Sequence, residues 1–342
     1  MSSADPTIRK HDDLPGATGL EALGLKWLAE PMADGGAHVV PVTAGPGWIE
    51  EPRLVSGSVT AAAAEAFGRA LAVTHAAGAP AFGVAPPGWD GRTQMGRSNE
   101  RIRPHRSEPA AAEPRRWGEF FADDRLAPYL APCLDQGSLT RRDAAVIERV
   151  CERLRDGDFD ADQPTLVRRG ARERGDRVAV ARTHGDLWTG NVMWVPERTI
   201  GWAPPRAGRG PAGVSSPATA GSPATAGSSA TAGSPATAAN PATAGSPAGA
   251  DAAGRRGRDD VVGVLIDPLA QGAHAETDLA ALGVFGQRHL ERVIAGYHEV
   301  SPLADGWRER VGLHQLHMLI IHAFLFGGSY GPETAAVAGR YA

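Results

Sequence analysis

The sequence is poor in cysteine, lacks a long apolar run and carries no large excess of either charge. Its cysteines, Cys133 and Cys151, are too few for a disulfide framework and fit a reducing cytoplasm. No stretch reaches the roughly 18 consecutive apolar residues of a membrane-spanning helix. No apolar segment follows a basic start, so we expect no secretory signal peptide and no membrane partner. The net charge of −4 shows no basic excess of the kind that indicates a nucleic-acid partner.

Bulky side chains are missing from one internal segment, residues 203–258. A hexad close to Ser-Pro-Ala-Thr-Ala-Gly recurs there from Ser216 onward. Such hexads cannot bury enough apolar surface to offset the loss of chain entropy, so we predict that this insert is disordered. The apolar runs Val192–Val195 and Val261–Ile266 on either side predict two short strands. The insert would then form the tip of a hairpin, where a long insertion costs little.

The rest of the chain has short apolar runs near its start and longer helical patterns after about residue 60. With 342 residues, it is long enough for a two-lobed enzyme with a substantial core. The predicted strands are Thr7–Lys10, Val39–Val42, Trp48–Ile49 and Val178–Ala181, and the predicted helices are Leu20–Ala29, Thr60–Ala76, Trp117–Leu130, Arg141–Arg155, Asp278–His298 and Trp307–Phe326. Residues 82–114 are rich in Gly, Pro and Arg and predict irregular structure.

The residues best suited to chemistry lie in His184-Gly185-Asp186-Leu187-Trp188-Thr189-Gly190-Asn191 and in Leu265-Ile266-Asp267-Pro268. Asp186 can orient or deprotonate a hydroxyl, while Asn191 and Asp267 offer the oxygen ligands that magnesium prefers. Phosphoryl transfer needs such a set, because its catalysis is mainly positioning and charge neutralisation. The offset from Asp186 to Asn191 equals that of the protein-kinase catalytic loop. Each of the three could instead be an ordinary turn or cap residue, but together they predict a kinase-like phosphotransferase.

Four further residues have both a functional and a structural interpretation. Lys10 and Glu21 can form the ion pair that holds the α- and β-phosphates of ATP. Alternatively, Lys10 is solvated and Glu21 closes a capping box with Thr18. His184 is expected to brace the loop by hydrogen bonds. Trp188 either stacks on the acceptor sugar or packs against the core.

Histidines and arginines elsewhere suggest other sites. His314, His317 and His322 invite a metal interpretation, but no carboxylate or cysteine stands at close spacing to complete a ligand set. We therefore expect core or interface histidines. The arginines between Arg92 and Arg116 either contact an anionic acceptor or form a solvated basic loop.

Together these motifs resemble the fructosamine kinase (ketosamine-3-kinase) family, a branch of the protein-kinase-like superfamily near the aminoglycoside and choline kinases. The resemblance covers residues 8–330 apart from the insert. It rests on the two motifs above and on the following segments: Glu21-Ala22-Leu23-Gly24-Leu25 with Leu28, Trp117-Gly118-Glu119-Phe120-Phe121 with Arg125-Leu126, Gly272-Ala273-His274-Ala275-Glu276-Thr277-Asp278-Leu279-Ala280, Leu313-His314-Gln315-Leu316 and Phe326-Gly327-Gly328-Ser329-Tyr330. Trp188 separates this family from the aminoglycoside kinases, whose loop usually has His there.

The resemblance implies an α+β, protein-kinase-like fold with a small mixed lobe over a mainly helical large lobe. The lobes would comprise a partial small lobe (1–55) and a large lobe in two parts (56–202 and 259–342), separated by the insert (203–258). It also implies ATP- and Mg²⁺-dependent phosphorylation of the sugar of a ketoamine, typically at O3, which releases the amine in a deglycation repair. The implied roles are Asp186 as base, Asn191 and Asp267 as metal ligands, Lys10 and Glu21 as the ATP-binding pair, and Asp278 as a brace of the loop.

The sequence departs from the family pattern at two places besides the insert. The Gly-rich phosphate loop and its two strands, which the family places upstream of Lys10, are not in the chain, so we expect either a late start or an incomplete small lobe. The segment after Gly88 keeps only Met95-Gly96 of the family pattern. Two alternatives therefore stand beside a ketoamine kinase: a kinase of another small hydroxylated acceptor, and a catalytically impaired ATP-binding module.

Overall fold

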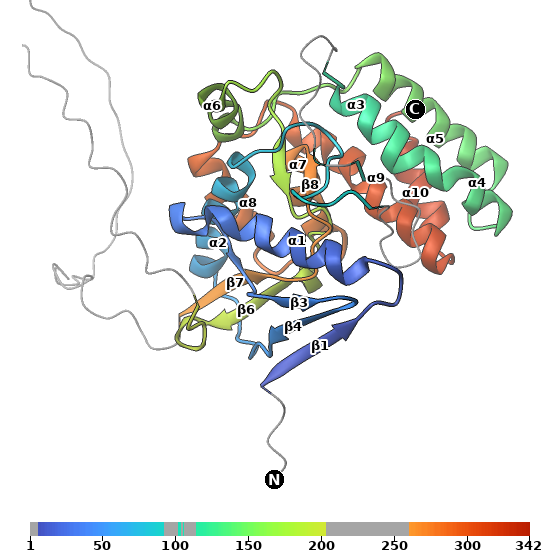
Figure 1. The fold of residues 1–342 in the computed structure, drawn as a ribbon. Coiled ribbons are helices and arrows are strands. Elements are labelled where there is room, and N and C mark those ends of the chain that lie inside the picture. The colour runs from blue at the N-terminus through green and yellow to red at the C-terminus, as the bar shows by residue number, and fades with distance from the viewer. Residues whose placement is uncertain (1–5, 92–101, 104, 106–113, 203–259) are drawn as a thin grey trace, which may run out of the picture. The chain divides into compact units, whose positions relative to one another are not determined.

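The computed structural model describes residues 6–91, 102, 103, 105, 114–202 and 260–342, which belong to one compact unit. The insert at 203–258 and most of the arginine-rich segment at 92–116 lie outside the described residues. The small sheets of this unit combine strands from residues 7–52 and 181–273, and helices make up most of the rest (Figure 1). This is the α+β composition that we predicted.

The strands form three small sheets with the orders β1-β4-β3, β2-β7-β6 and β5-β8. Their bounds are β1 Thr7–His11, β2 His38–Val39, β3 Thr43–Gly45, β4 Trp48–Pro52, β5 Ala181–Thr183, β6 Val192–Pro196, β7 Val261–Leu265 and β8 Gln271–Ala273. β1 runs antiparallel to β4 and pairs Lys10 with Ile49. Helix α1 (Ala17–Ala29) packs on β3 and β4 of this sheet.

The helices account for most of the chain after β4. Beyond α1, they are α2 Ala61–Ala76, α3 Trp117–Phe120, a π-helical turn Phe121–Leu126, α4 Ala127–Asp135, α5 Arg141–Asp156, α6 Thr165–Arg174, α7 Ala275–Val284, α8 Leu290–Val300, α9 Trp307–Phe326 and α10 Tyr330–Ala338. Short 3₁₀ turns cover Glu30–Asp34, Thr189–Asn191 and Glu197–Thr199.

Helices α2 and α8 pack closely because glycines stand at their contact. A Cβ atom on Gly68 would lie 2.0 Å from the Val293 carbonyl oxygen, and one on Gly296 would lie 2.1 Å from the Glu65 carbonyl oxygen. Two backbones can approach this closely only where no side chain stands between them. The contact anchors α2, which carries His75 toward the candidate site.

The hairpin predicted around the insert is confirmed. β6 and β7 pair antiparallel from Val192 opposite Leu265 to Pro196 opposite Val261. The end that carries Val192 and Leu265 adjoins Asn191 and Asp267. The opposite end, at Pro196 and Val261, is where the chain leads into the insert.

Several predicted helices are confirmed, and α9 matches its predicted bounds of Trp307–Phe326. Thr60 caps α2, its hydroxyl accepting from the Ala63 amide. The single helix predicted over Trp117–Leu130 is wrong, because a π-helical turn interrupts it. The helix predicted over Asp278–His298 begins earlier and is broken where Gly286 and His289 take positive φ angles.

Two predicted strands also differ from the structure. The first, β2, ends at Val39 instead of reaching Val42, since Pro41 has no amide hydrogen to donate to a neighbouring strand. The second, β5, begins at Ala181 rather than at Val178, because its pairing with β8 starts at Ala181. Cys133 and Cys151 are buried and unbridged in helices, as expected.

Candidate active site

Asp278, in the first turn of α7, holds the loop that follows β5. The Asp278 carboxylate accepts hydrogen bonds from the backbone amides of His184 (2.6 Å) and Gly185 (3.0 Å). It also lies 3.2 Å from Nε2 of the buried His75. Burial acts to raise the pKa of Asp278, but the hydrogen bonds and charges of His75 and His184 outweigh it and lower that pKa. An ionised carboxylate therefore sits beneath the loop, in the position expected of a brace.

His184 ties the same loop to the end of β7. Its Nε2 lies 2.9 Å from the Ile266 carbonyl oxygen, and its Nδ1 accepts from the Asp186 amide at 3.3 Å. Nε2 therefore carries the proton and Nδ1 is the acceptor. Burial lowers the pKa of His184. Both ring nitrogens are engaged with backbone, which is the geometry of a loop brace.

Asp186, Asn191 and Asp267 are brought together at the mouth of the β6–β7 hairpin. The Asn191 side-chain nitrogen donates to the Asp186 carboxylate (3.0 Å) and to the Asp186 carbonyl oxygen (2.8 Å). It also lies 3.4 Å from the Asp267 carbonyl oxygen. The Asn191 amide thus fixes the loop that carries Asp186 against the turn that carries Asp267.

Asp267 has an unusual backbone conformation. Its φ angle is +49°, in the left-handed region that Asp tolerates better than most residues. Its side chain is 46% exposed. The backbone thus turns sharply at the end of β7, and the carboxylate remains accessible to a ligand.

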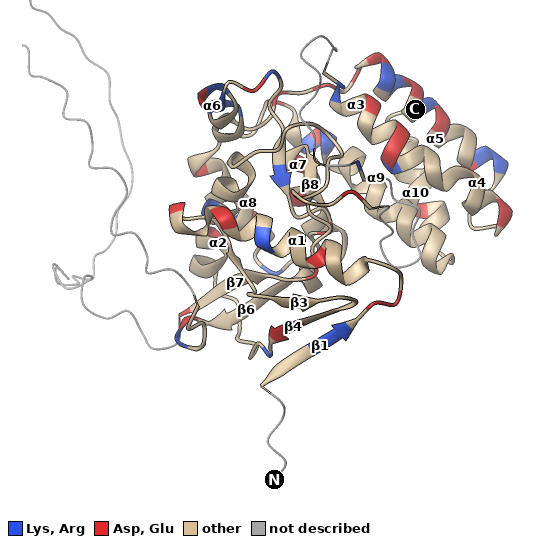
Figure 2. Cartoon of the chain, in the orientation of Figure 1, with Lys and Arg blue, Asp and Glu red and all other residues tan. Residues whose placement is uncertain are grey.

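Lys10 lies among three carboxylates. Its Nζ is 2.7 Å from Glu21 and 3.4 Å from Glu51, and it also contacts Asp267 at short range. In Figure 2 the basic part of β1 lies beside acidic residues of β4. The predicted Lys10–Glu21 contact is therefore present. The capping-box alternative is wrong, because Asp12 accepts from the Thr18 amide and hydroxyl while Glu21 reaches Lys10.

The pKa values of the three carboxylates in this cluster shift in different directions. Burial would lower the pKa of Lys10, but hydrogen bonds to Asp267 and Glu21 outweigh it and raise that pKa. Burial, together with the nearby Asp267, raises the pKa of Glu21 to about 8 despite the lysine. Burial also raises the pKa of Glu51. Burial acts to raise the pKa of Asp267, but hydrogen bonds to Glu21 and Lys10 outweigh it and lower that pKa. Lys10 and Asp267 therefore form the charged pair of this cluster.

Glu51 is the member of this cluster that sequence analysis missed. It is buried on β4, two residues after the buried Ile49, and its Oε1 has no hydrogen-bond partner among the described residues. The sequence shows Glu51 only as one of two adjacent glutamates, so the alternation of buried and half-buried residues along β4 could not be recognised from it. The direction in which Glu51 points depends on the pairing of β4 with β1.

The oxygen-rich end of this region has the donor chemistry of a magnesium site. Asn191 and Asp267 supply an amide and a carboxylate, which suit a hard cation that keeps several waters. Separately, one carboxylate oxygen each of Glu21, Glu51 and Asp267 lie within 4.8 Å of one another. Asp267 belongs to both groups, while Lys10 stands inside the second. The Asn191–Asp267 pair is therefore the better candidate for a cation.

Trp188 packs against neighbouring residues, one of the two roles considered for it, while stacking on an acceptor sugar stays a prediction. Its ring contacts Phe285 edge to face at a centroid distance of 5.7 Å, and it is half-buried. The ring also covers Gly190, where an added Cβ atom would lie 2.3 Å from a ring carbon.

His314 and His317 are buried, as expected of core histidines, although a carboxylate distant in sequence, that of Glu276, lies near His314. His274, Glu276 and His314 offer ligand atoms within 4.8 Å of one another. However, Arg310 binds both oxygens of Glu276, at 2.7 and 2.9 Å. The His274 Nδ1 accepts from the Glu276 amide, so its Nε2 carries the proton and cannot bind a metal. The cluster is a buried ion-pair network, and burial lowers the pKa of His274 to about 4.

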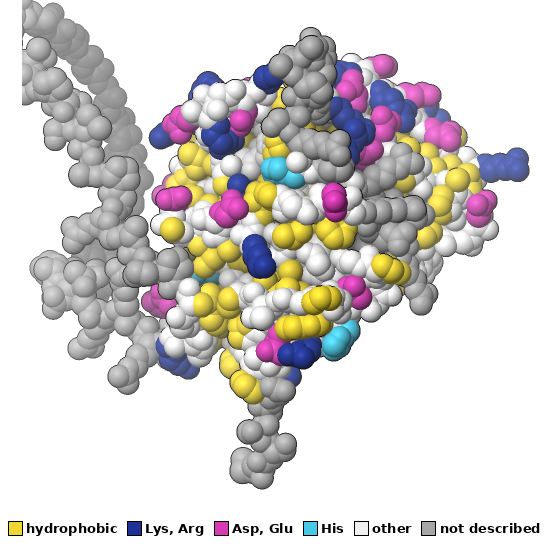
Figure 3. All heavy atoms as spheres, viewed as in Figure 1, with side chains coloured by type: hydrophobic (Ala, Val, Ile, Leu, Met, Phe, Trp, Pro, Cys, Tyr) yellow, Lys and Arg dark blue, Asp and Glu magenta, His cyan; other side chains and the backbone are white. Residues whose placement is uncertain are grey.

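Those arginines of the 92–116 segment that the structure describes are bound within the protein. Arg103 and Arg115 both contact Asp124, at 3.1 and 2.5 Å. Arg116 contacts Glu119 and Asp160. On the face drawn in Figure 3, basic and acidic side chains are interspersed rather than separated by sign.

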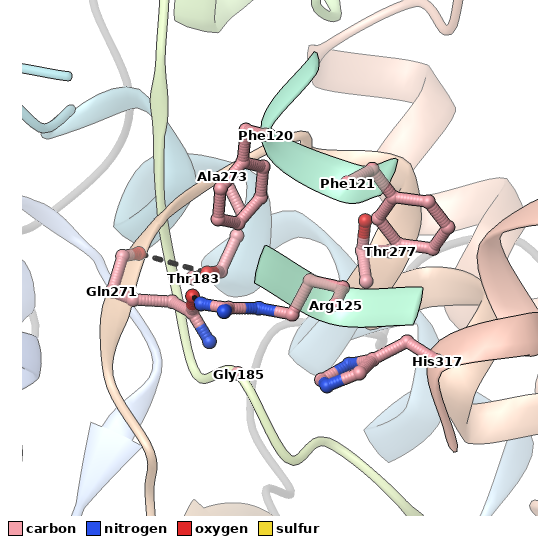
Figure 4. A pocket seen from close by; sticks show the side chains of 9 residues that line it. All are labelled: Phe120, Phe121, Arg125, Thr183, Gly185, Gln271, Ala273, Thr277 and His317. Carbon is pink, nitrogen blue, oxygen red and sulfur yellow. Dashed lines mark hydrogen bonds between the residues drawn. The ribbon is translucent and has the colours of Figure 1, made fainter. Parts of the chain in front are cut away.

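A small cavity lies behind the loop that carries Asp186 (Figure 4). Its volume of about 10 Å³ is roughly the room that one water molecule needs. The lining residues are Phe120, Phe121, Arg125, Thr183, Gly185, Gln271, Ala273, Thr277 and His317. The cavity is therefore too small for a sugar in this conformation.

Among the residues that the structure describes, no helix is both long and apolar enough to cross a membrane.

Comparison with known proteins identifies the family. The sequence profile of the fructosamine kinase family matches residues 54–205 and 252–341. A probable ketoamine kinase of Enterococcus faecium is 36% identical over 71 residues, 21% of this chain and 25% of that protein. One of Klebsiella aerogenes is 23% identical over 242 residues, 71% of this chain and 55% of that protein. The chain thus spans between a quarter and about half of these relatives.

Solved structures agree in fold. A protein of Thermobifida fusca YX-ER1, assigned as a fructosamine-3-kinase, superposes with a TM-score of 0.63 and is 30% identical, covering 98% of this chain and 85% of that one. A second, from Haemophilus somnus 129PT, has a TM-score of 0.58 at 14% identity, covering 98% of this chain and 82% of that one. The predicted protein-kinase-like fold is confirmed, and the chain belongs to the fructosamine kinase family.

Proposed function

We propose that this protein transfers the γ-phosphoryl group of ATP to a sugar hydroxyl of a ketoamine, in a deglycation repair. The observation that carries the proposal is the position of Asp186. Its loop is braced by Asp278 and His184, and its carboxylate is held 3.0 Å from the Asn191 amide. A carboxylate fixed in this way can accept one proton from a substrate hydroxyl at a defined point.

In the proposed reaction, the sugar hydroxyl oxygen forms a bond to the γ-phosphorus while the bond to the bridging β–γ oxygen breaks. The hydroxyl proton passes to Asp186, and ADP leaves with the bridging oxygen. Asn191 and Asp267 would hold Mg²⁺, which neutralises phosphate charge when bound. Lys10, oriented by Glu21, would donate to the α- and β-phosphates. Asp186, Asn191 and Asp267 lie together at the end of the β6–β7 hairpin. Lys10 contacts Asp267 there and also contacts Glu21.

Trp188 supports a ketoamine acceptor. It is half-buried and stands two residues from Asp186 in the same loop, where it would contact a sugar whose hydroxyl meets that carboxylate. An aromatic face also attracts the ammonium group of a ketoamine.

We further propose that the protein acts in a reducing cytoplasm, a location that the two free, buried cysteines support.

The test is ADP release from Mg-ATP in the presence of ribuloselysine or fructoselysine, with Asp186→Asn as the blank. We expect turnover by the wild type and a loss of roughly 10²- to 10⁴-fold in the variant, the usual contribution of a positioned base. Mg-ATP binding by the variant should persist, since Asp186 acts on the acceptor. Equal turnover by the variant would refute Asp186 as the base. Turnover with an aminoglycoside or choline alone would identify another acceptor class, and nucleotide binding without any turnover would identify a binding module.

A further inference from the structure

Arg125 is a fully buried cation behind the candidate catalytic loop. It lies in the π-helical turn Phe121–Leu126 and is 1% exposed. Its guanidinium donates to the Asp124 carbonyl oxygen at 3.0 Å and to the Gln271 side-chain oxygen, and it lies over the Phe120 ring at 4.5 Å. In Figure 4 it reaches across the cavity toward Gln271.

The π-helical turn explains how Arg125 comes to point inward. The Ala127 amide donates to the Ala122 carbonyl oxygen, five residues earlier. The wider turn shifts the following side chains relative to those of a regular α-helix. Such turns are rare and are often found at functional sites.

Gln271 lies between the two segments that carry the proposed catalytic groups. Its backbone oxygen accepts from the Thr183 hydroxyl at 2.8 Å, at the start of the loop (Figure 4). Its side-chain nitrogen lies 3.5 Å from the Leu269 carbonyl oxygen, two residues after Asp267. A Cβ atom on Gly185 would lie 2.9 Å from that nitrogen and 1.9 Å from the Leu269 oxygen. Gly185 thus rests directly on Gln271 and Leu269.

Arg125 determines which way the Gln271 amide faces. A guanidinium can only donate hydrogen bonds, whereas an amide has an accepting end and a donating end. Arg125 therefore holds the oxygen of Gln271 toward itself. The amide nitrogen must then face the Leu269 oxygen and the backbone of Gly185.

We propose that Arg125 and Gln271 are a positioning pair that sets the separation between the Asp186 loop and the Asp267 turn. This proposal rests on the proposed function for the roles of Asp186 and Asp267. Neither residue of the pair needs to touch substrate. Gln271 contacts both segments, and Arg125 fixes its orientation.

The experiment compares Gln271→Glu, Arg125→Met and Arg125→Lys with the control Arg103→Met. Glu at 271 still accepts from Arg125 but places an acceptor against the Leu269 oxygen. Arg103 contacts Asp124 in the same π-helical turn but is 51% exposed. We expect kcat to fall at least tenfold in Gln271→Glu and Arg125→Met, with KM for ATP and ketoamine changed less than threefold. Arg125→Lys, which keeps a donor, should recover part of the loss, and Arg103→Met should resemble the wild type.

Hydrogen–deuterium exchange without substrates gives a readout that does not depend on turnover. We expect faster exchange in peptides covering 183–191 and 267–273 of Gln271→Glu and Arg125→Met, and unchanged exchange in α9. If the wild type lacks ketoamine turnover, the proposed function fails, and the exchange data alone test the pair. Unchanged exchange and kcat would overturn the pair. Faster exchange that extends equally to α9 would also overturn it, because it would indicate a general loss of stability. If Gln271→Glu does not fold, the difference between Arg125→Lys and Arg125→Met tests the pair.

Discussion

The carboxylate of Asp278 accepts a hydrogen bond of 2.6 Å from the backbone amide of His184. Its other oxygen accepts from the next amide, that of Gly185, at 3.0 Å. An ionised carboxylate has two accepting oxygens and no donor, so it suits two adjacent amides that point the same way. A residue of α7 thereby fixes the start of a loop that lies more than ninety positions earlier in the chain.

Replacing Asp278 by Asn should damage both the loop and stability. One end of the new amide can no longer accept, so one buried backbone amide loses its partner at a cost of about 1–3 kcal/mol. Displacement of the loop should lower kcat by about 10²-fold, while Mg-ATP still binds. Urea unfolding and ADP release measure the two effects. Asp158→Asn, in an exposed ion pair with Arg153, is the control, and unchanged kcat in Asp278→Asn would contradict the brace.

Gly185→Ala should destabilise the protein far more than Gly35→Ala. Both glycines have positive φ angles, +83° and +94°, where an alanine costs about 1–2 kcal/mol. Only at Gly185 would the added Cβ also collide with backbone, 1.9 Å from the Leu269 oxygen, whereas at Gly35 none of the described residues lies within 4 Å of it. We expect a loss of more than about 3 kcal/mol for Gly185→Ala. Equal urea midpoints for the two variants would show that the loop can move away from Leu269.

Stability should fall in mild acid because His274 is buried. Its pKa is lowered by burial to about 4, against about 6.5 in the unfolded chain. Between these values the unfolded chain binds a proton that the folded protein does not, so the free energy of unfolding decreases as pH falls. This contribution is fully present above pH 6.5 and amounts to a loss of about 2 kcal/mol at pH 5.

Urea unfolding at pH 7.5 and pH 5 tests this effect in the wild type and in His274→Gln. The variant should lose less stability between the two values, since it has no imidazole at this position. The exposed His11→Gln serves as the control and should retain the full dependence. An identical pH dependence in all three proteins would show that other groups cause the change.

Deleting residues 215–250 should preserve cooperative unfolding and activity. The hexads carry no bulky apolar side chain, and β6 and β7 are already paired as far as Pro196 and Val261. Roughly halving the connection should lower its closure cost by about 0.6 kcal/mol. Differential scanning calorimetry and ADP release would check both points. Loss of a cooperative transition would mean that the insert is part of the fold.

Local patterns in the sequence were sufficient for elements that bury a regular face or carry a clear end signal. Trp307–Phe326 and the helix after Thr60 are examples. Helices α6 and α10 were missed. Only Val167 and Ala171 are buried in the arginine-rich α6, so it shows little apolar periodicity. Strand β8 was missed because Gln271–Ala273 has no strand preference, and its conformation depends on pairing with β5.

The candidate site was predictable where its residues are close in sequence and less so where they are distant. Asp186, Asn191 and Asp267 were recognised by their spacing and by the strands that precede them. Glu51, His75 and Gln271 were not, because each acquires its contact through tertiary packing. The π-helical turn at Arg125 also leaves no local signal, since its hydrogen bonds differ from those of an α-helix by one residue.

The β6–β7 hairpin separates the candidate site from the insert. Asn191 and Asp267 adjoin one end, while residues 203–258 are connected to the other, five paired positions away. Because the insert joins the far end of the hairpin, a change in its number of hexads would leave unaltered the register that places Asn191 beside Asp267.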